Sequence, residues 1–451
     1  MTPEHPDWLV PHAARPVHAR VELPGSKSMT NRALVLSALA DGPVEIVGPL
    51  AARDTRLMAE GLRALGCVIT ETDGSWVVEP LSGQPGRRAG RSAEIDVGNA
   101  GTVLRFLPAI AALSGMQVRF TGDPRIAERP VGPLLRALTE LGARISAAGT
   151  GSVPFVVHGE DRLAGGEVTL DASSSSQLIS GLLLAAPRFT AGARIRHQGP
   201  PVPSAPHIEM SVRMLRACGI QVTTGPETAP ASGDLTGHEL FDEFEWKVFP
   251  GSISAAQFVI EPDLSNAVPF LAAALATGGT VTVAGWPVDS LQPAQRIIDV
   301  LTAMGAEVTH TGSGLRVSGS GQISGIDADL SAVGELTPVL TALAALAGSP
   351  SRFTGIGHLR RHETDRLAAL AGEIGKLGGD VTELGDGLAI RPRPLRADGV
   401  VFDSHDDHRL VMAAAVLGLV TGGLRVHNAA TVGKTFPGFG EYWATALVSS
   451  G

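Results

Sequence analysis

A nine-residue pattern recurs five times along this chain of 451 residues. The copies are LRALGCVIT at 62–70, LTELGARIS at 138–146, LRACGIQVT at 215–223, LTAMGAEVT at 301–309 and IGKLGGDVT at 374–382. In each copy, apolar residues three apart end a helix, a glycine allows the chain to turn with positive φ, and apolar–polar alternation begins a strand. The repeat therefore predicts a fold built from similar α/β units.

A second pattern lies between these copies. Polar or small residues open an Ala/Leu-rich helix, which ends in glycine before a short strand. The six helices begin near Ser28, Thr102, Ser175, Ser254, Glu335 and Asp407. They are apolar nearly all round, so we expect them to be buried. Together the two patterns indicate six units of about 70–80 residues, each with two helices and several strands.

The chain is too long for one ordinary core, so we expect two domains of three units each. The sixth unit ends before its closing strand, and residues 17–23 read as a strand without a preceding helix. We therefore expect residues 17–23 to complete the C-terminal unit. The predicted domains are 1–24 plus 250–451, which is discontinuous, and 25–249, which is continuous. Hinges near Pro24–Gly25 and Phe249–Gly251 would let a ligand close the molecule.

Composition narrows the classes of function. The net charge of −9 disfavours a nucleic-acid partner, which requires a basic surface. Cys67 and Cys218 are the only cysteines; both lie within the repeats, so we expect them in the core and the chain in a reducing cytoplasm. The N-terminal residues have no apolar signal-peptide core, and apolar stretches such as 410–420 are too short to span a membrane.

Cations gather at the predicted helix starts. The chain has 36 Lys and Arg residues, of which only four are lysines. The cations at helix starts or in adjacent loops are Lys27, Arg32, Arg125, Arg129, Arg366, Arg409 and Lys434. A helix N-terminus already carries partial positive charge, so a cation there is unfavourable unless an anion binds as well. Taken singly, each could instead be a solvated charge or a local ion pair.

Two of the four lysines, Lys27 and Lys434, belong to this set. An ammonium is a compact point charge, unlike the planar guanidinium, and suits a small anionic group. Ser26 and Ser28 flank Lys27 and could add hydroxyl donors, or simply cap the helix. The carboxylates at the same positions are Glu335, Glu363, Asp365, Asp406 and Asp407. Such carboxylates could move protons, although local pairing is favoured for Asp365 and Asp406.

Two motif interpretations are weaker. The segment NAATVGKT at 428–435 resembles a P-loop, but Asn428 replaces its first glycine and the next residues form a poor helix. The segment HDDH at 405–408 has metal-binding residue types, but adjacent side chains rarely converge on one ion. We therefore expect no metal and no cofactor.

Longer stretches resemble one known family. They are LPGSKSMTNRALVLSALADG, GNAGTVLRF, GDPRIAERPVGPL, DASSSSQLISGLLLAAP, HETDRL, DDHRLVMAAAV and GKTFPGF, in order along the chain. They look like the 5-enolpyruvylshikimate-3-phosphate synthase family. The resemblance implies two inside-out α/β barrel domains, each of three βαβαββ repeats, joined by a two-strand hinge. It also implies transfer of the enolpyruvyl group of phosphoenolpyruvate to the 5-hydroxyl of shikimate 3-phosphate, on the pathway to chorismate and aromatic amino acids.

The resemblance also implies the site. Residues expected to bind shikimate 3-phosphate are Lys27, Ser28, Arg32, Ser175, Ser176, Gln177, Ser204, Glu335 and His362. Residues expected to bind phosphoenolpyruvate are Lys27, Asn99, Gly101, Arg129, Gln177, Arg366, Arg409 and Lys434. Glu335 would take the proton of the 5-hydroxyl, Glu363 would protonate the methylene carbon, and Lys27 would contact both ligands. The resemblance further implies a monomer that glyphosate inhibits in competition with phosphoenolpyruvate.

The sequence departs from the family pattern at several positions. They are Glu335 for Asp, His358 for Asn, His362 for Lys, His207 for Tyr, and Phe106 for Pro. If His362 binds as an imidazolium, binding of shikimate 3-phosphate should weaken as pH rises; as a neutral ring it would only donate a hydrogen bond.

Three other functions are weighed against this one. The UDP-N-acetylglucosamine enolpyruvyl transferases share the fold but carry a reactive cysteine in the loop that matches GDPRIAERP, where this chain has none. RNA 3′-phosphate cyclases would bind RNA, which the acidic charge disfavours. A non-catalytic anion-binding module would need no carboxylates among its cations.

Overall fold

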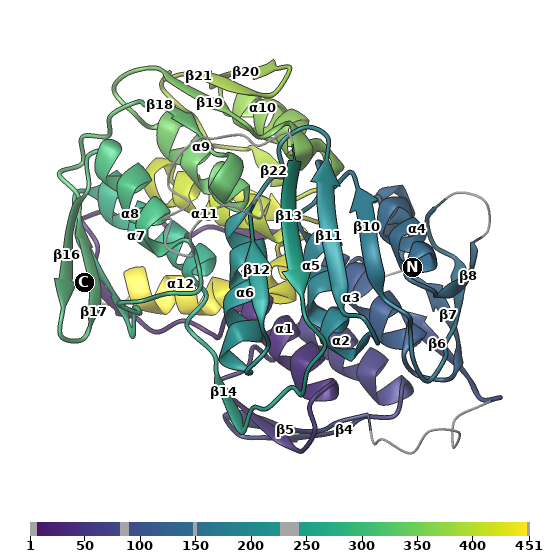
Figure 1. Ribbon diagram of the computed structural model, residues 1–451. Helices are drawn as coiled ribbons and strands as arrows, with labels where there is room; N and C mark the ends of the chain where they lie inside the picture. Colours follow the sequence, from purple (N-terminus) through teal and green to yellow (C-terminus); the bar gives the residue numbers. More distant parts are fainter. Residues whose placement is uncertain (1–6, 82–89, 148–150, 226–242, 449–451) are drawn as a thin grey trace. The chain divides into compact units, whose positions relative to one another are not determined.

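The computed structural model describes residues 7–81, 90–147, 151–225 and 243–448, so the first six residues of the N-terminal segment lie outside it (Figure 1). The chain divides into two compact units. Unit 1 is Met1–Ser26 with Glu261–Gly451, and unit 2 is Lys27–Ile260. The second crossing of the chain thus follows Ile260, later than the expected hinge at Phe249–Gly251.

The segment around Phe249–Gly251 belongs to unit 2 because its backbone bonds there. Phe249 N donates to Gln221 O at 3.1 Å, and Gly251 N donates to Pro187 O at 3.1 Å. The chain then forms strand β14 (Gln257–Val259), which pairs in parallel with β3 (Val44–Val47). Because β14 pairs with β3, it belongs to unit 2, which ends directly after this strand at Ile260.

Unit 2 contains three sheets and six helices among its described residues. The helices are α1 (Lys27–Ala38), α2 (Arg53–Ala64), α3 (Gly101–Ala112), α4 (Gly132–Glu140), α5 (Gln177–Ala185) and α6 (Pro206–Ala217). The first sheet joins β14 and β3 to β5 (Ser75–Glu79) and β4 (Val68–Thr72). The second is β6 (Ser92–Asp96), β7 (Gln117–Thr121), β9 (Phe155–His158) and β8 (Arg144–Ala147). The third is β10 (Gly166–Leu170), β11 (Ala193–Gln198), β13 (Glu243–Val248) and β12 (Val222–Thr224).

Unit 1 repeats this plan. Its helices are α7 (Leu264–Thr277), α8 (Ala294–Ala303), α9 (Thr337–Ala345), α10 (Arg366–Lys376), α11 (His408–Thr421) and α12 (Phe439–Leu447). One sheet is β2 (His18–Val21), β15 (Thr280–Ala284), β17 (Gly314–Ser318) and β16 (Glu307–Thr311). The next is β18 (Asp327–Asp329), β19 (Ser351–Thr354), β21 (Gly387–Arg391) and β20 (Asp380–Leu384). The last has three strands, β22 (Val401–Asp403), β23 (Arg425–His427) and β1 (Trp8–Leu9).

The predicted turn after each repeated helix is confirmed. The helix ends and the following strand begins within each of the five nine-residue copies. Their glycines have φ values of 104° (Gly66), 106° (Gly142), 83° (Gly219), 104° (Gly305) and 86° (Gly378). A residue with a Cβ rarely adopts this conformation, so the repeated glycine sets the angle between helix and strand.

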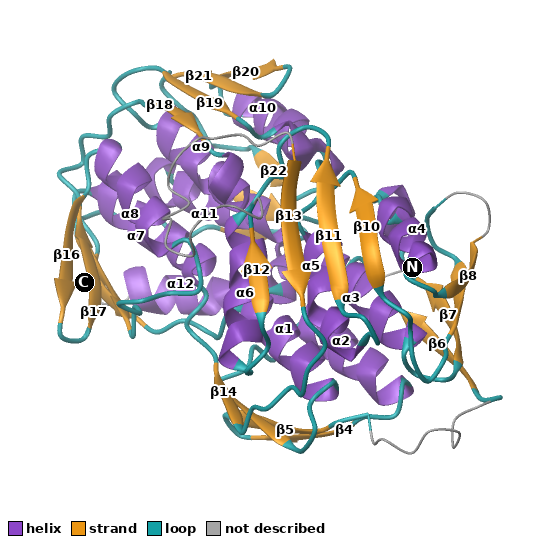
Figure 2. Ribbon diagram, viewed as in Figure 1, coloured by secondary structure: helices purple, strands orange, loops and turns teal. Residues whose placement is uncertain are grey.

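The prediction of buried helices is also confirmed. Every residue of α3 and α9 is buried, as is most of α1, α5, α7 and α11. Within unit 2, α3 contacts α1 and α5; within unit 1, α11 contacts α7 and α9. Figure 2 shows these helices inside each unit with the sheets outside.

The α/β class expected from the sequence is confirmed, but the barrel is not. Each four-stranded sheet has one parallel pair followed by two antiparallel pairings. The described strands form six separate sheets with free edges, so strand pairing closes none of them into a barrel.

Two other expectations need correction. Residues 17–23 do not complete the C-terminal unit, because β2 pairs in parallel with β15; the short strand β1 instead pairs with β23. The fourth buried helix begins at Leu264 rather than near Ser254, since the Asp263 side chain caps it by accepting from Asn266 N at 3.0 Å.

Neither a membrane segment nor a reactive thiol is found in the described part of the chain. None of its helices is both long and apolar enough to cross a bilayer. Cys67 and Cys218 are free and buried, and burial raises the pKa of Cys218 to about 11. A thiol with so high a pKa is a poor nucleophile, in line with the core position expected for both residues.

Candidate functional site

The N-terminal turns of the three buried helices meet in unit 2. Asn31 Nδ2 of α1 donates to Thr102 Oγ1 of α3 at 2.8 Å. Arg105 Nη1 of α3 lies 3.3 Å from Gln177 Oε1, at the first residue of α5. Three helix starts with partial positive charge are thus held close together, which favours an anion at this end of the unit.

Arg32 lies in this region as a buried cation that forms no salt bridge with the part of the chain that the structure describes. The side chain is 1% exposed. Its guanidinium donates to neutral oxygens only: Ser211 Oγ at 2.8 Å, Ser180 Oγ at 3.2 Å, His207 O at 2.8 Å and Ser28 O at 3.0 Å. The Phe106 ring lies 5.3 Å from its Cζ. Burial lowers the pKa of Arg32 to about 9, so an anionic ligand would stabilise its charge.

Arg129, Asn99 and Gly101 form a second group in unit 2. Arg129 is 6% exposed, and its Nη1 lies 3.3 Å from Asn99 O. Gly101 starts α3 directly beneath it: a Cβ there would lie 2.5 Å from Arg129 Nη2. Guanidinium groups of Arg129 and Arg105 therefore occupy the space that a side chain at Gly101 would fill.

The remaining candidates of unit 2 lie on the loops around these groups. Lys27 begins α1, and its Nζ lies 3.4 Å from the buried Asp54. Ser175 Oγ accepts from Gln177 N at 3.3 Å, and Ser176 precedes α5 as its N-cap. Ser204 has a φ of 54°, a strained value for a residue with a side chain.

In unit 1 the candidates form a buried ion network. Arg366, the first residue of α10, donates to Asp407 Oδ2 from Nε at 2.7 Å and to Glu363 Oε2 from Nη2 at 3.0 Å. Lys434 Nζ lies 3.2 Å from Glu363 Oε1. Burial by itself would lower the pKa of Arg366, but Asp407 and Glu363 outweigh it and raise that pKa. Glu363 thus lies between two cations that stabilise its charge.

Arg409 differs from Arg366 and Lys434, which each form a salt bridge with a carboxylate. It is 6% exposed and forms no salt bridge with any described residue, while its Nη1 lies 3.9 Å from Met412 Sδ. Burial lowers the pKa of Arg409; the charge of Asp263 opposes this shift, and the charge of Arg366 adds to it. Glu335 acts electrostatically on Arg409, Arg366 and His358, yet pairs with no cation of the described chain. Unit 1 therefore offers a buried cation that forms no salt bridge with the described residues, while Asp263, Glu335 and Asp407 stabilise it only through their charge.

Two histidines adjoin Glu335 and Arg366. Burial is the main reason that the pKa of His358 falls to about 4, despite the opposing charge of Glu335. His362 Nδ1 lies 3.2 Å from Arg366 Nη1. A guanidinium can only donate, so Nδ1 accepts in this contact, which agrees with the hydrogen-bonding role of His362. The same Nδ1 lies 4.0 Å from Glu363 Oε2, which agrees with the charged role, so both alternatives stay predictions.

Other predicted residues make local pairs. Arg125 pairs with Glu128, Asp365 caps α10 at Leu367 N and Ala368 N, and Asp406 accepts from Asn428. The residues of HDDH thus bond to different partners, and no cluster of His, Cys, Asp or Glu suited to a metal occurs among the described residues. Local pairing was the favoured expectation for Asp365 and Asp406, and it is confirmed.

Sequence reasoning did not single out Arg105, which the structure places beside the candidate residue Gln177. It is 2% exposed, contacts Gln177, and donates from Nη2 to Pro130 O at 2.9 Å. A charged residue inside the apolar stretch of α3 was the available signal.

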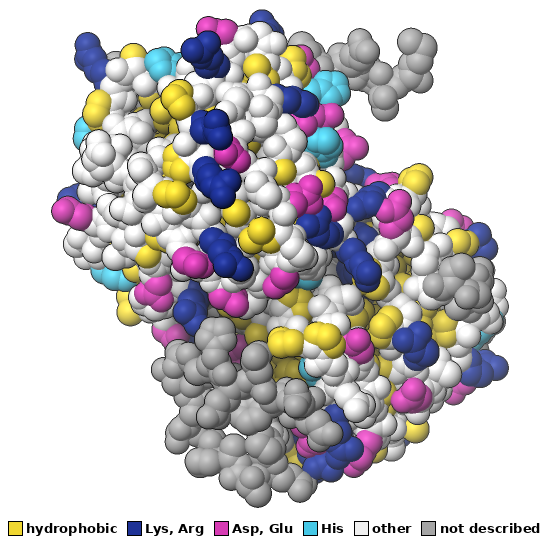
Figure 3. Space-filling view, turned by 90° about the horizontal axis from the view of Figure 1, so that it is seen from above, with side chains coloured by type: hydrophobic (Ala, Val, Ile, Leu, Met, Phe, Trp, Pro, Cys, Tyr) yellow, Lys and Arg dark blue, Asp and Glu magenta, His cyan; other side chains and the backbone are white. Residues whose placement is uncertain are grey.

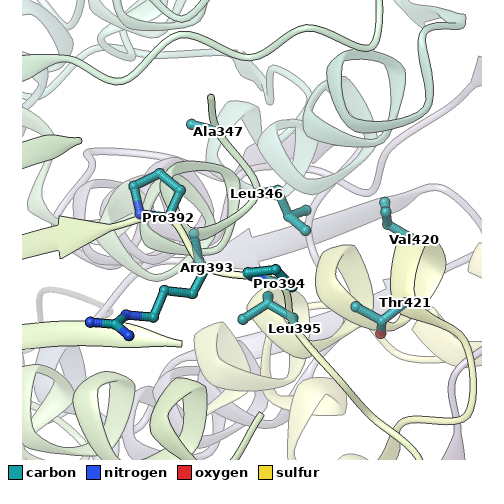
Figure 4. Close-up of a pocket in the computed structure, with 9 residues that line it drawn as sticks. Leu346, Ala347, Pro392, Arg393, Pro394, Leu395, Val420 and Thr421 are labelled. Carbon is teal, nitrogen blue, oxygen red and sulfur yellow. The ribbon is translucent and has the colours of Figure 1, made fainter. Parts of the chain in front are cut away.

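One cavity of the described structure does not coincide with these residues. It has a volume of about 550 Å³ and is lined by residues that include Leu346, Pro392, Leu395 and Thr421, as Figure 4 shows. These lie where α9 and α11 end, about 20 Å along α11 from Arg409. On the face seen in Figure 3, acidic and basic side chains are interspersed, so surface charge does not mark a site there.

Comparison with known proteins identifies the family. Residues 11–443 match the model of the EPSP synthase (3-phosphoshikimate 1-carboxyvinyltransferase) family. Two structures of EPSP synthase from Acinetobacter baumannii are similar, each 24% identical over 98% of both chains, with TM-scores of 0.76 and 0.74. The enolpyruvyl transferase NikO from Streptomyces tendae has a TM-score of 0.72 at 16% identity, again over 98% of both chains. The chain therefore belongs to the EPSP synthase family, the 3-phosphoshikimate 1-carboxyvinyltransferases, which are transferases of the shikimate pathway to the aromatic amino acids.

Proposed function

We propose that the chain transfers the enolpyruvyl group of phosphoenolpyruvate to the 5-hydroxyl of shikimate 3-phosphate by addition and elimination, with release of phosphate. The observation that carries the proposal is the pair of buried guanidinium groups, Arg32 and Arg409, that form no salt bridge with any described residue. An unpaired buried cation destabilises the ligand-free protein, so its presence is explained by an anionic ligand.

Two anionic substrates would use the two groups of residues. The proposal assigns shikimate 3-phosphate to Lys27, Ser28, Arg32, Ser175, Ser176, Gln177, Ser204, Glu335 and His362. It assigns phosphoenolpyruvate to Lys27, Asn99, Gly101, Arg129, Gln177, Arg366, Arg409 and Lys434. Burial of Arg32, Arg129, Arg366, Arg409 and Lys434 supports this assignment, because a desolvated cation holds an anion more strongly than an exposed one.

Glu335 is proposed as the base for the 5-hydroxyl. It has no cation paired with it in the described chain, so its carboxylate oxygens are available to accept a proton. Glu363 is proposed to protonate the methylene carbon and to remove that proton again in the elimination step. Arg366 and Lys434 now stabilise its negative charge. Phosphoenolpyruvate would draw these cations toward its own charges, and Glu363 would then hold a proton more readily.

Lys27 would neutralise charge on both substrates and on the tetrahedral intermediate, which loses phosphate to form the enol ether. The addition and elimination transfer protons, release phosphate and move the enolpyruvyl group to the 5-hydroxyl oxygen, and no step requires a metal or a cofactor. The family expectations of a cytoplasmic monomer and of competition between glyphosate and phosphoenolpyruvate are part of this proposal.

Phosphate release tests the proposal directly. The protein should release phosphate only when both shikimate 3-phosphate and phosphoenolpyruvate are present. Arg409→Met should abolish most of the release, whereas Arg393→Met should not, since Arg393 is an exposed residue paired with Asp380. Release with UDP-N-acetylglucosamine in place of shikimate 3-phosphate would refute the proposed acceptor.

A further inference from the structure

His197 is a buried histidine that the proposed reaction does not use. It lies near the end of β11 and is 3% exposed. In the parallel pairing of β10 with β11, it is opposite Leu170, the last residue of β10. Beyond this pair the two strands separate into loops, which we name the serine loop (171–176) and the Ser204 loop (199–205).

Both ring nitrogens of His197 are engaged, one with each loop. Ala172 N of the serine loop donates to Nδ1 at 3.2 Å, and Nε2 lies 2.8 Å from Pro200 O of the Ser204 loop. A backbone amide only donates and a carbonyl oxygen only accepts, so Nδ1 is the acceptor and Nε2 carries the proton. The ring is therefore neutral, with one tautomer fixed by its neighbours.

Each partner of His197 leads directly to residues assigned to shikimate 3-phosphate. On the serine loop, Ala172 O accepts from Ser175 N at 3.0 Å, and Ser175 Oγ accepts from Gln177 N. Beyond Pro200, Ser204 adopts its positive φ, and its carbonyl accepts from His207 N at 3.0 Å. One imidazole thus bridges the two loops that carry the serine candidates, and Gln177 follows the first of these loops directly.

The two loops are also packed closely beside this bridge. A Cβ at Gly199 would lie 2.9 Å from Asp171 Oδ1, so the loops approach nearer than a side chain at that position would allow. Asp171 Oδ1 in turn accepts from Ser173 N at 2.8 Å. The spacing between the loops therefore depends on a few specific contacts past the end of the strand pairing.

We propose that His197 is a positioning residue for the proposed acceptor site: it sets the spacing between Ser175, Ser176 and Gln177 on one side and Ser204 on the other, and so shapes the site for the phosphate of shikimate 3-phosphate. This inference rests on the proposed function. His197 does not contact the ligand itself, because both of its nitrogens are already bonded. It acts through the backbone of the two loops.

Three substitutions separate the two bonds of the ring. His197→Leu removes both bonds, His197→Asn can keep the acceptor toward Ala172, and His197→Gln can keep the donor toward Pro200. In His197→Leu we expect the KM for shikimate 3-phosphate to rise at least tenfold. The KM for phosphoenolpyruvate at saturating shikimate 3-phosphate, and kcat, should stay within threefold. The Asn and Gln variants should show rises of two- to fivefold.

The matched control is His158→Gln. His158 lies on β9, where its Nε2 is 2.9 Å from Ser146 Oγ. Neither His158 nor Ser146 is a candidate site residue. Its KM values should equal those of the parent. If His197 only filled the core, the Leu variant would lose thermal stability and active fraction with an unchanged KM for shikimate 3-phosphate. That result would overturn the proposal, and so would unchanged KM values in the Asn and Gln variants if the Leu variant failed to fold.

Amide hydrogen exchange at Ala172, measured without ligand, distinguishes this inference from the proposed function. Exchange should be at least tenfold faster in the Leu variant than in the parent. If the parent fails to turn over shikimate 3-phosphate, the proposed function and the ligand assignment both fail, but faster exchange would still support the bridge between the loops. Equal exchange in parent and variant would overturn the bridge itself.

Discussion

Gly101→Ala should weaken the binding of phosphoenolpyruvate and of glyphosate through Arg129. A Cβ at this position would lie 2.5 Å from Arg129 Nη2, 2.8 Å from Arg105 Nη1 and 3.0 Å from Arg129 Cζ. All three atoms belong to the ends of flexible side chains, so the methyl group can be accommodated if the guanidinium groups move. Contact becomes ordinary at 3.4 Å, so Arg129 must shift by about 0.9 Å.

The size of the effect follows from this displacement. A hydrogen bond to a charged group contributes roughly 1.5–3 kcal/mol, and it weakens steeply beyond its normal length. A shift of about 0.9 Å would remove most of one such bond between Arg129 and an anion. Since about 1.4 kcal/mol corresponds to a factor of ten, the dissociation constant of the anion should rise roughly 10- to 150-fold.

The assay compares dissociation constants of phosphoenolpyruvate and glyphosate for the parent, Gly101→Ala, Arg129→Met and the double variant, each with shikimate 3-phosphate bound. If the methyl group acts through Arg129, the double variant should bind no more weakly than Arg129→Met alone. Persistence of the full loss when Arg129 is already absent would refute the reasoning. So would an unchanged affinity for both anions in the single variant Gly101→Ala.

Three further predictions concern unit 1. Burial holds the pKa of His358 at about 4 when folded, against an unfolded value near 6.5, so the unfolded chain binds more protons between these values and stability falls as pH drops. Between pH 7.5 and pH 5, the free energy of unfolding should fall by about 2 kcal/mol less in His358→Gln than in the parent. Urea titrations of both proteins at both pH values would show this difference. If His362 acts as a neutral acceptor for Arg366, His362→Lys should leave the pH profile of shikimate 3-phosphate binding parallel to that of the parent above pH 7; a flatter profile in the variant would support the charged role instead. Asp407→Asn should lower the free energy of unfolding by roughly 3–5 kcal/mol, because it breaks the buried pair with Arg366. Asp380→Asn breaks an exposed pair with Arg393 and should lower the free energy of unfolding by only about 0–1 kcal/mol. Similar losses in the two variants would contradict the burial argument.

Local patterns were enough to predict the repeating elements. The positive φ at Gly66 and Gly305 and the burial of α3 and α9 follow from residue periodicity and backbone sterics, which depend only on neighbours in the chain. The concentration of cations at helix starts was also visible in the sequence, because it needs only the position of each residue within its helix. The family resemblance rested on the same local stretches, and the family match over residues 11–443 confirmed it.

Tertiary structure alone decided which groups are partners. Spacing could not show that β2 pairs with β15 or that guanidinium groups fill the space above Gly101. Nor could it show that Arg366 bonds Asp407 while Arg409 forms no salt bridge with the described residues. Burial and hydrogen bonding join residues far apart in the chain, and the same guanidinium is a solvated charge or an anion site depending on what surrounds it. His197 shows this most clearly, since its tautomer and its position between two loops follow from Ala172 and Pro200 and from nothing in the residues beside it.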